Sequence, residues 1–132
     1  PDRIKALLAK VTKHRKQVEA ADEGFDRVLN SLEGDRRRLF QTNLVVQQRI
    51  LLALLRWHEE SLRGGLALHE GNRQETLARL EAALKAVRSV RDAKALASYG
   101  HWKHWYRGDK KMNVSAIEKL AEEVVEAYRK AQ

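Results

Sequence analysis

The residues best suited to bind a ligand lie between positions 99 and 113, where aromatic rings alternate with cations. This stretch reads Tyr-Gly-His-Trp-Lys-His-Trp-Tyr-Arg-Gly-Asp-Lys-Lys-Met-Asn. Aromatic side chains beside lysine and arginine can stack on bases or sugar rings, or form cation–π pairs at an interface. We therefore predict a binding segment here, with the candidate residues Trp102, Lys103, Trp105, Tyr106, Arg107 and Lys110.

The same aromatic side chains could instead close one end of a helical core. Trp102 and Trp105 have the spacing of one helical face, and Tyr106 would extend that face. Aromatic residues at such spacing are usually buried. Lys103 and Arg107, however, must keep their charged ends in water. We expect one tryptophan to be partly exposed for contact and the other to anchor the segment.

Residues that could catalyse a reaction or bind a metal form no complete set. His101 and His104 have the spacing of two ligands on one helical face, but a zinc site needs a third ligand, and the sequence has no cysteine. The run from His58 to Glu60 is expected at the exposed edge of a helix. There is no glycine-rich phosphate loop and no nucleophile elbow. We therefore predict no cofactor, no metal and no enzymatic activity, and an enzyme with a His/Glu site is the least favoured function.

The chain is basic, with a net charge of +8 from 26 basic and 18 acidic residues. A positive charge favours polyanionic partners, yet the charges are dispersed along the chain, as is typical of a soluble surface. Arg36, Arg37 and Arg38 form one cluster, at a predicted helix start where phosphates can bind. A basic helical module that binds nucleic acid is therefore the alternative function, although three arginines there more often form a solvated face.

Hydrophobic spacing predicts about four helices, the first over residues 2–32. Apolar residues recur there every seven positions, and a second line follows three positions after each. The second line contains His14, which we expect at the edge of the core and not as a metal ligand. The two lines are Ile4, Val11, Val18, Phe25 and Leu32, and Leu7, His14, Ala21 and Val28.

Capping signals mark the starts of the other three helices. Asp35 is the expected N-cap of a helix over 36–68. Asn72 with Glu75 forms a capping-box pattern before a helix that reaches about residue 97. The last helix is expected to begin after Asn113 or after Ser115, and Ser115 with Glu118 forms a second such pattern.

These helices predict an all-α fold, an up-down antiparallel bundle of about four helices. Short connections between long amphipathic helices favour antiparallel neighbours, and 132 residues fit one domain over 1–132. A long coiled-coil hairpin that dimerises is the alternative, and the oligomeric state stays open. The densest apolar stretch, Ile50 to Leu55, is far shorter than the roughly 20 residues of a membrane span, so no membrane is expected.

Two stretches of the sequence carry a resemblance to known proteins. The first runs from Asn43 to Trp57, and the second from Gly100 to Asn113. Both resemble the helical C-terminal regions of large bacterial glycan-acting proteins of the glycoside hydrolase type. The resemblance implies a non-catalytic accessory domain, a fragment of a larger protein, outside the cytoplasm. Its implied partner is the rest of that parent protein or a polymeric glycan.

Overall fold

The computed structural model describes residues 1–97 and 113–131, and every regular element in these ranges is helical. This confirms the predicted all-α class. The elements are α1 (Asp2–Ser31), α2 (Gly34–Phe40), a π-helical turn η1 (Gln41–Val45), α3 (Val46–His69), α4 (Arg73–Ala95) and α5 (Val114–Lys130).

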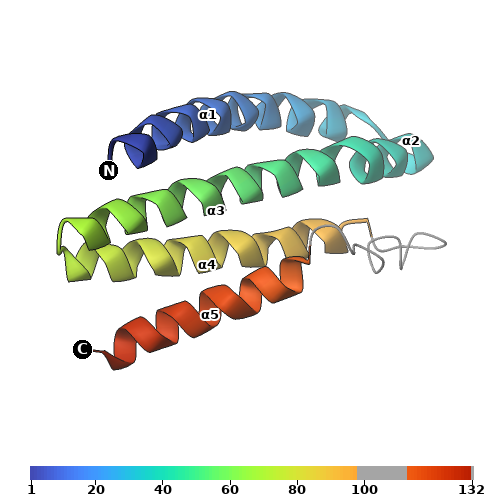
Figure 1. Ribbon diagram of the computed structural model, residues 1–132. Helices are drawn as coiled ribbons and strands as arrows, with labels where there is room; N and C mark the ends of the chain where they lie inside the picture. The colour runs from blue at the N-terminus through green and yellow to red at the C-terminus, as the bar shows by residue number, and fades with distance from the viewer. Residues whose placement is uncertain (98–112, 132) are drawn as a thin grey trace.

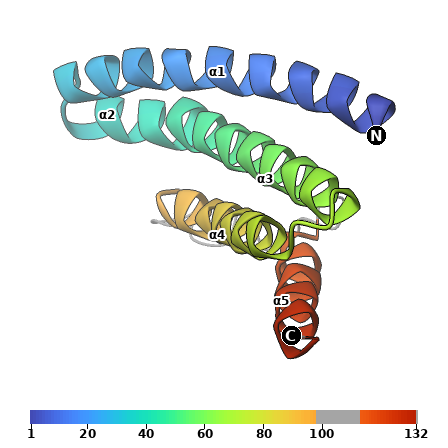
Figure 2. The same cartoon turned by 90° about the vertical axis from the view of Figure 1, so that its left-hand side faces the viewer.

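The four long helices run alternately up and down and lie side by side in the order α1, α3, α4, α5 (Figure 1 and Figure 2). The most extensive contact joins α3 to α4, while α1 packs on α3 and α5 packs on α4. The predicted up-down antiparallel arrangement is therefore confirmed. Each helix packs chiefly against its neighbour in the sequence, so α1 and α5 flank a central α3–α4 pair.

The predicted second helix is a single helical run from Gly34 to His69, in which the turn η1 interrupts the α-helical pattern. A π-helical turn holds more than 3.6 residues, so it shifts the faces of α2 relative to those of α3. The consecutive residues Val45 and Val46 directly at this junction are both completely buried. Two adjacent residues can be buried together because α3 is covered by α1 and by α4.

Asparagine side chains cap two of the helices. At α4, Asn72 accepts a hydrogen bond from the backbone N–H of Glu75 at 3.1 Å, as predicted. At α5, Asn113 accepts from the N–H of Ala116 at 3.1 Å. Of the two predicted starts, the one after Asn113 is confirmed, and the capping box at Ser115 is wrong because Ser115 lies in the first turn of α5.

Two glycines supply the left-handed backbone at the turns. Gly34 has φ +53° between α1 and α2, and Gly71 has φ +72° between α3 and α4. Side chains with a Cβ rarely adopt this region, so glycine suits both positions. At the first turn Glu33 holds the N-cap position. The predicted cap at Asp35 is wrong, since Asp35 lies inside the first turn of α2.

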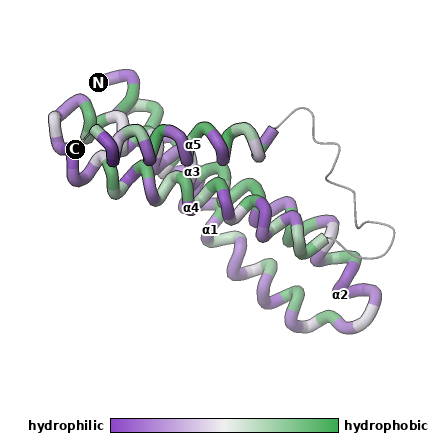
Figure 3. Tube along the Cα trace, turned by 90° about the horizontal axis from the view of Figure 1, so that it is seen from below, coloured by the Kyte–Doolittle hydropathy of each residue, from purple (hydrophilic) through white to green (hydrophobic). Residues whose placement is uncertain are grey.

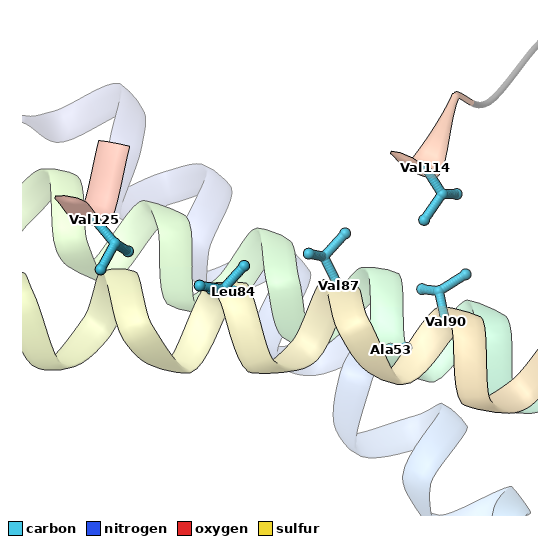
Figure 4. Close-up of a cluster of buried hydrophobic side chains, with 6 residues drawn as sticks. All are labelled: Ala53, Leu84, Val87, Val90, Val114 and Val125. Carbon is cyan, nitrogen blue, oxygen red and sulfur yellow. The ribbon is translucent and has the colours of Figure 1, made fainter. Parts of the chain in front are cut away.

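The hydrophobic core lies between α3, α4 and α5. Along α4, three apolar side chains point toward α5, as Figure 4 shows. At Gly64 of α3, a side chain would place its Cβ atom 3.4 Å from the Cβ of Arg79, so the glycine allows α3 and α4 to approach closely. The buried cluster consists of Ala53, Leu84, Val87, Val90, Val114 and Val125.

Helix α1 buries much less than its sequence pattern predicts. Leu7 and Val28, on the second predicted line of α1, are 49% and 44% exposed. Only Leu29 of α1 is fully buried. His14 is exposed, so its predicted place at the core edge is wrong. Only α3 packs extensively along α1, and one neighbour covers one narrow side of a helix. Figure 3 shows apolar and polar residues alternating along the helices.

Candidate functional site

The aromatic binding segment predicted from the sequence lies outside the described residues, apart from its last residue, Asn113. This applies to His101 and His104 and to all six candidate binding residues, which are Trp102, Lys103, Trp105, Tyr106, Arg107 and Lys110. Their role stays a prediction. The described helices present two other surfaces with a definite chemistry, one ionic and one apolar.

The centre of the ionic surface is Glu59, a carboxylate of α3 that is only 3% exposed. It accepts hydrogen bonds from Thr12 Oγ1 at 3.1 Å, from Arg15 Nε, and from Arg63 Nη2 at 2.8 Å. Thr12 and Arg15 belong to α1, so this carboxylate joins α1 to α3. The expectation that the run from His58 to Glu60 forms an exposed edge is wrong for Glu59.

The seven-residue spacing explains why Glu59 is buried. Val45 and Leu52 precede it at this interval, and both are buried at 0% and 5% exposure. Residues at this spacing lie on the same side of a helix, so Glu59 continues an inward-facing line. The signal was present in the sequence, but a charged residue flanked by His58 and Glu60 suggested a polar edge.

The electrostatic state of Glu59 follows from two opposing effects. Burial alone would raise the pKa of this carboxyl group, because it disfavours the charged form. Hydrogen bonds from Arg63, Arg15 and Thr12, together with the charge of Arg15, outweigh burial and hold the pKa below its usual value. The carboxylate therefore stays ionised at neutral pH and keeps its cationic partners in place.

Further ion pairs extend from Glu59 along the contact between α1 and α3. Arg49 Nη2 lies 2.9 Å from Asp26, and Arg56 Nη2 lies 2.6 Å from Glu19. On α3, Arg49, Arg56 and Arg63 follow one another at intervals of seven residues. On α1, the same interval separates Glu19 from Asp26. We call this set the ionic seam; it comprises Arg15, Glu19 and Asp26 of α1 with Arg49, Arg56, Glu59 and Arg63 of α3.

A groove of about 620 Å³ opens beside the seam, between α1, α3 and α4. On its α4 side, Arg79 pairs with Glu60 at 3.0 Å and with Glu75 at 2.7 Å. Lys85 forms no ion pair or hydrogen bond within the part of the chain that the structure describes. We call this the arginine groove; it is lined by Arg15, Arg56, Glu59, Glu60, Arg63, Arg79, Ala82, Lys85, Ala86 and Ser89.

A second hollow of about 430 Å³ continues the arginine groove along α3 and shares Arg56 and Ser89 with it. It also contains Arg49 and two carboxylates, Asp22 and Asp92. The Oδ1 atom of Asp22 is buried and has no hydrogen-bond partner among the described residues. Together the two hollows carry the whole arginine line of α3.

The apolar surface lies on the other side of the α1–α3 contact. Leu51 is 46% exposed, and Leu55 and Leu62 follow at helical spacing as half-buried neighbours. Helical geometry places Leu51, Leu55 and Leu62 well around α3 from the line of Arg49, Arg56 and Arg63. We define the apolar face as Leu7 and Val28 of α1 with Leu51, Leu55 and Leu62 of α3.

The arginine cluster that motivated a nucleic-acid function is divided by the fold. Arg37 is half-buried, and its Nη1 donates a hydrogen bond to the backbone carbonyl of Leu29. This contact holds the turn between α1 and α2 and satisfies a carbonyl at the end of α1. Arg36 and Arg38 remain on the surface beside Leu39, which is 65% exposed.

Metal binding and membrane insertion find no support in the described helices. Within residues 1–97 and 113–131, no group of three or more His, Asp or Glu side chains could hold a metal ion. The helices in these ranges include none long and apolar enough to cross a membrane. No family model, curated protein or solved structure matches the chain.

Proposed function

We propose that this chain is a non-catalytic helical interaction domain whose apolar face packs against the rest of a larger glycan-acting protein. The observation that carries the proposal is the exposure of leucine and valine side chains along α1 and α3, at 44% to 49% for Leu7, Val28 and Leu51. Contiguous exposed apolar residues usually mark a protein interface. The sequence resemblance supports a glycan-acting parent protein.

The charges around the apolar face favour a partner with an acidic rim. Arg3 and Lys10 lie four residues before and three residues after Leu7, so helical geometry places them beside it on α1. His14, seven residues after Leu7, is exposed on the same side. A second copy of the chain would bring like charges together. A different surface, apolar at its centre and acidic at its edge, is therefore the better complement.

The segment from 99 to 113 has a second role in the proposal. Its residue types suit contact with a polymeric glycan, because tryptophan and tyrosine rings stack on sugar rings while cations bind acidic groups. Either Trp102 or Trp105 is proposed to make this contact, while the other anchors the segment. This part of the proposal rests on the sequence alone, and replacing each tryptophan by alanine, with glycan binding measured, tests it separately.

The test of the apolar face uses the absence of cysteine from the sequence. A Leu51→Cys variant gives one thiol on the apolar face, and a Lys119→Cys variant gives a matched thiol on α5, where Lys119 is 78% exposed. Each variant is prepared in the isolated chain and in the complete product of the gene that encodes it. The rate of thiol modification is then measured in all four proteins.

We expect position 51 to react quickly in the isolated chain and at least tenfold more slowly in the complete gene product. Position 119 should react quickly in both proteins. Equal rates at position 51 in both proteins would overturn the proposal. A gene that encodes no further domain would overturn it as well.

A further inference from the structure

We infer that the arginine groove binds an extended acidic peptide segment of a partner protein. The inference goes beyond the proposed function, because it concerns the ionic side of the α1–α3 contact and not the apolar face. The groove lining carries five cations, Arg15, Arg56, Arg63, Arg79 and Lys85, and two carboxylates, Glu59 and Glu60. Two further carboxylates, Glu19 and Glu75, pair with its arginines from outside the lining, so the cations still outnumber the carboxylates by one.

The cations of the groove retain donors that the fold does not use. A guanidinium group has five N–H donors, and Arg56 and Arg63 each form one hydrogen bond within the described residues. Their side chains are 49% and 39% exposed, so the remaining donors are accessible from the groove. Lys85 has no partner in the described ranges and adds a further ammonium group from α4.

The arginines are also held in place before any ligand binds. Glu19 fixes Arg56 at 2.6 Å, and Glu59 fixes Arg63 at 2.8 Å. A side chain that is already ordered loses less conformational entropy on binding. Arginine in such a fixed orientation can bind a carboxylate through two parallel hydrogen bonds. The ion pairs of the seam thus orient donors for an incoming anion.

The spacing of the cations points to a peptide in an extended conformation. Arg56 and Arg63 of the groove, and Arg49 in the hollow that continues it, are separated by seven residues of helix, which corresponds to steps of about 10.5 Å. In a polyproline II chain every third side chain points in the same direction, at steps of about 9.3 Å. A peptide with an acidic residue at every third position therefore nearly matches the arginine line.

The groove walls favour a peptide over a nucleic acid. The lining contains no aromatic residue among those that the structure describes, whereas single-stranded nucleic acids are usually held by bases stacked on aromatic rings. The α4 side offers Ala82, Ala86 and Ser89, whose small side chains leave room for a chain to lie close to the helix. Carboxylates at every third position leave neutral residues that can lie beside Glu59 and Glu60, whereas a nucleic acid carries a phosphate charge at every unit.

The test measures binding of two synthetic peptides of equal composition by calorimetry at physiological salt. One peptide has glutamate at every third position with proline between, and the other has the same glutamates in one block. The spaced peptide should bind at least about fivefold more tightly. Lys85→Gln and Arg56→Gln should each weaken its binding about tenfold, while the control Lys119→Gln changes the net charge equally and should leave it unchanged.

Lys85→Gln is the cleanest variant, since Lys85 forms no hydrogen bond or ion pair among the described residues. Equal weakening by Lys85→Gln and Lys119→Gln would reveal unspecific attraction to the basic chain and overturn the inference. So would equal binding of the two peptides, or no binding of either. A single-stranded oligonucleotide that binds more tightly and loses affinity in Lys85→Gln would overturn the peptide as the ligand.

Discussion

The two sides of α3 are held by different forces. On the α4 side, contacts are mainly apolar and close, with Val87 and Val90 completely buried, Gly64 allowing the helices to approach, and one ion pair between Arg79 and Glu60. On the α1 side, the ionic seam supplies most of the named contacts, and Leu29 is the buried apolar residue that α1 contributes. Helix α4 is thus held to α3 mainly by packing, whereas α1 is held to α3 largely by charge.

This difference indicates which helix should respond to changes in pH and ionic strength. Burial of apolar side chains depends little on pH and ionic strength, whereas ion pairs weaken in acid and, when exposed, in salt. We therefore expect α3, α4 and α5 to form the stable body of the domain. Helix α1 should be the element whose attachment changes with conditions.

The largest expected effect is in the apolar core. Replacing Leu84 by alanine removes a core side chain that is 9% exposed and leaves a cavity. It should lower the free energy of unfolding by about 2–4 kcal/mol, measured by denaturant titration. Leu120→Ala is the matched control, since Leu120 is 61% exposed, and should change stability by less than about 0.5 kcal/mol. Equal losses of stability in the two variants would contradict the assignment of Leu84 to the core.

A smaller effect is expected at the centre of the seam. Glu59→Gln keeps the size of the side chain but removes the charge that Arg15 and Arg63 bind. The free energy of unfolding should fall by about 1–3 kcal/mol, because hydrogen bonds to a charged group are lost. An unchanged midpoint in denaturant would show that this carboxylate does not hold α1 to α3.

The same variant tests the pH dependence of the seam. The folded-state pKa of Glu59 is lowered, so its contribution is fully present above the unfolded-state value of about 4.3 and is lost as the pH falls through the folded-state value. The stability difference between the native chain and Glu59→Gln should therefore be constant at neutral pH and shrink in acid. A difference that grows in acid would contradict the sign of this shift.

The smallest effect is expected at the exposed end of the seam. Arg49 and Asp26 are 35% and 49% exposed, so water and salt screen their interaction. A double-mutant cycle with Arg49→Gln and Asp26→Asn should give a coupling free energy of about 0.2–0.5 kcal/mol, and less at high salt. If this coupling free energy exceeded that between Glu59 and Arg15, it would contradict the expectation that the seam is strongest at Glu59.

Much of the fold was predictable because helix periodicity and capping act locally. The class, the up-down order and the cap at Asn72 follow from residues within a few positions of one another. The start of the last helix was left open between Asn113 and Ser115, since both residue types can begin a helix. Local patterns place a helix end only within a turn.

The candidate surfaces were less predictable because they depend on which neighbour covers which side of a helix. The heptad line of α1 predicted a buried stripe, but with one neighbour only part of it is covered, and Leu7 and His14 remain exposed. Glu59 was assigned to an exposed edge because its charge outweighed its place in the line of Val45 and Leu52. Glu19 and Asp26 of α1 have the same seven-residue spacing as Arg49 and Arg56 of α3. This match points to ion pairs only when α1 is known to lie beside α3.

The most direct test of the two modes of attachment is amide hydrogen exchange of the native chain, measured residue by residue at neutral pH and again at pH about 4, near the unfolded-state pKa of glutamate. We predict that amides near Thr12 and Arg15 in α1 exchange by an opening of lower free energy than amides near Val87 and Val90 in α4. We also predict that the gap widens at the lower pH, because glutamates of the opened state begin to take up protons there, while the folded-state pKa of Glu59 is lower. Equal opening free energies for α1 and α4 at both pH values would contradict the central claim that charge holds one helix and packing holds the other.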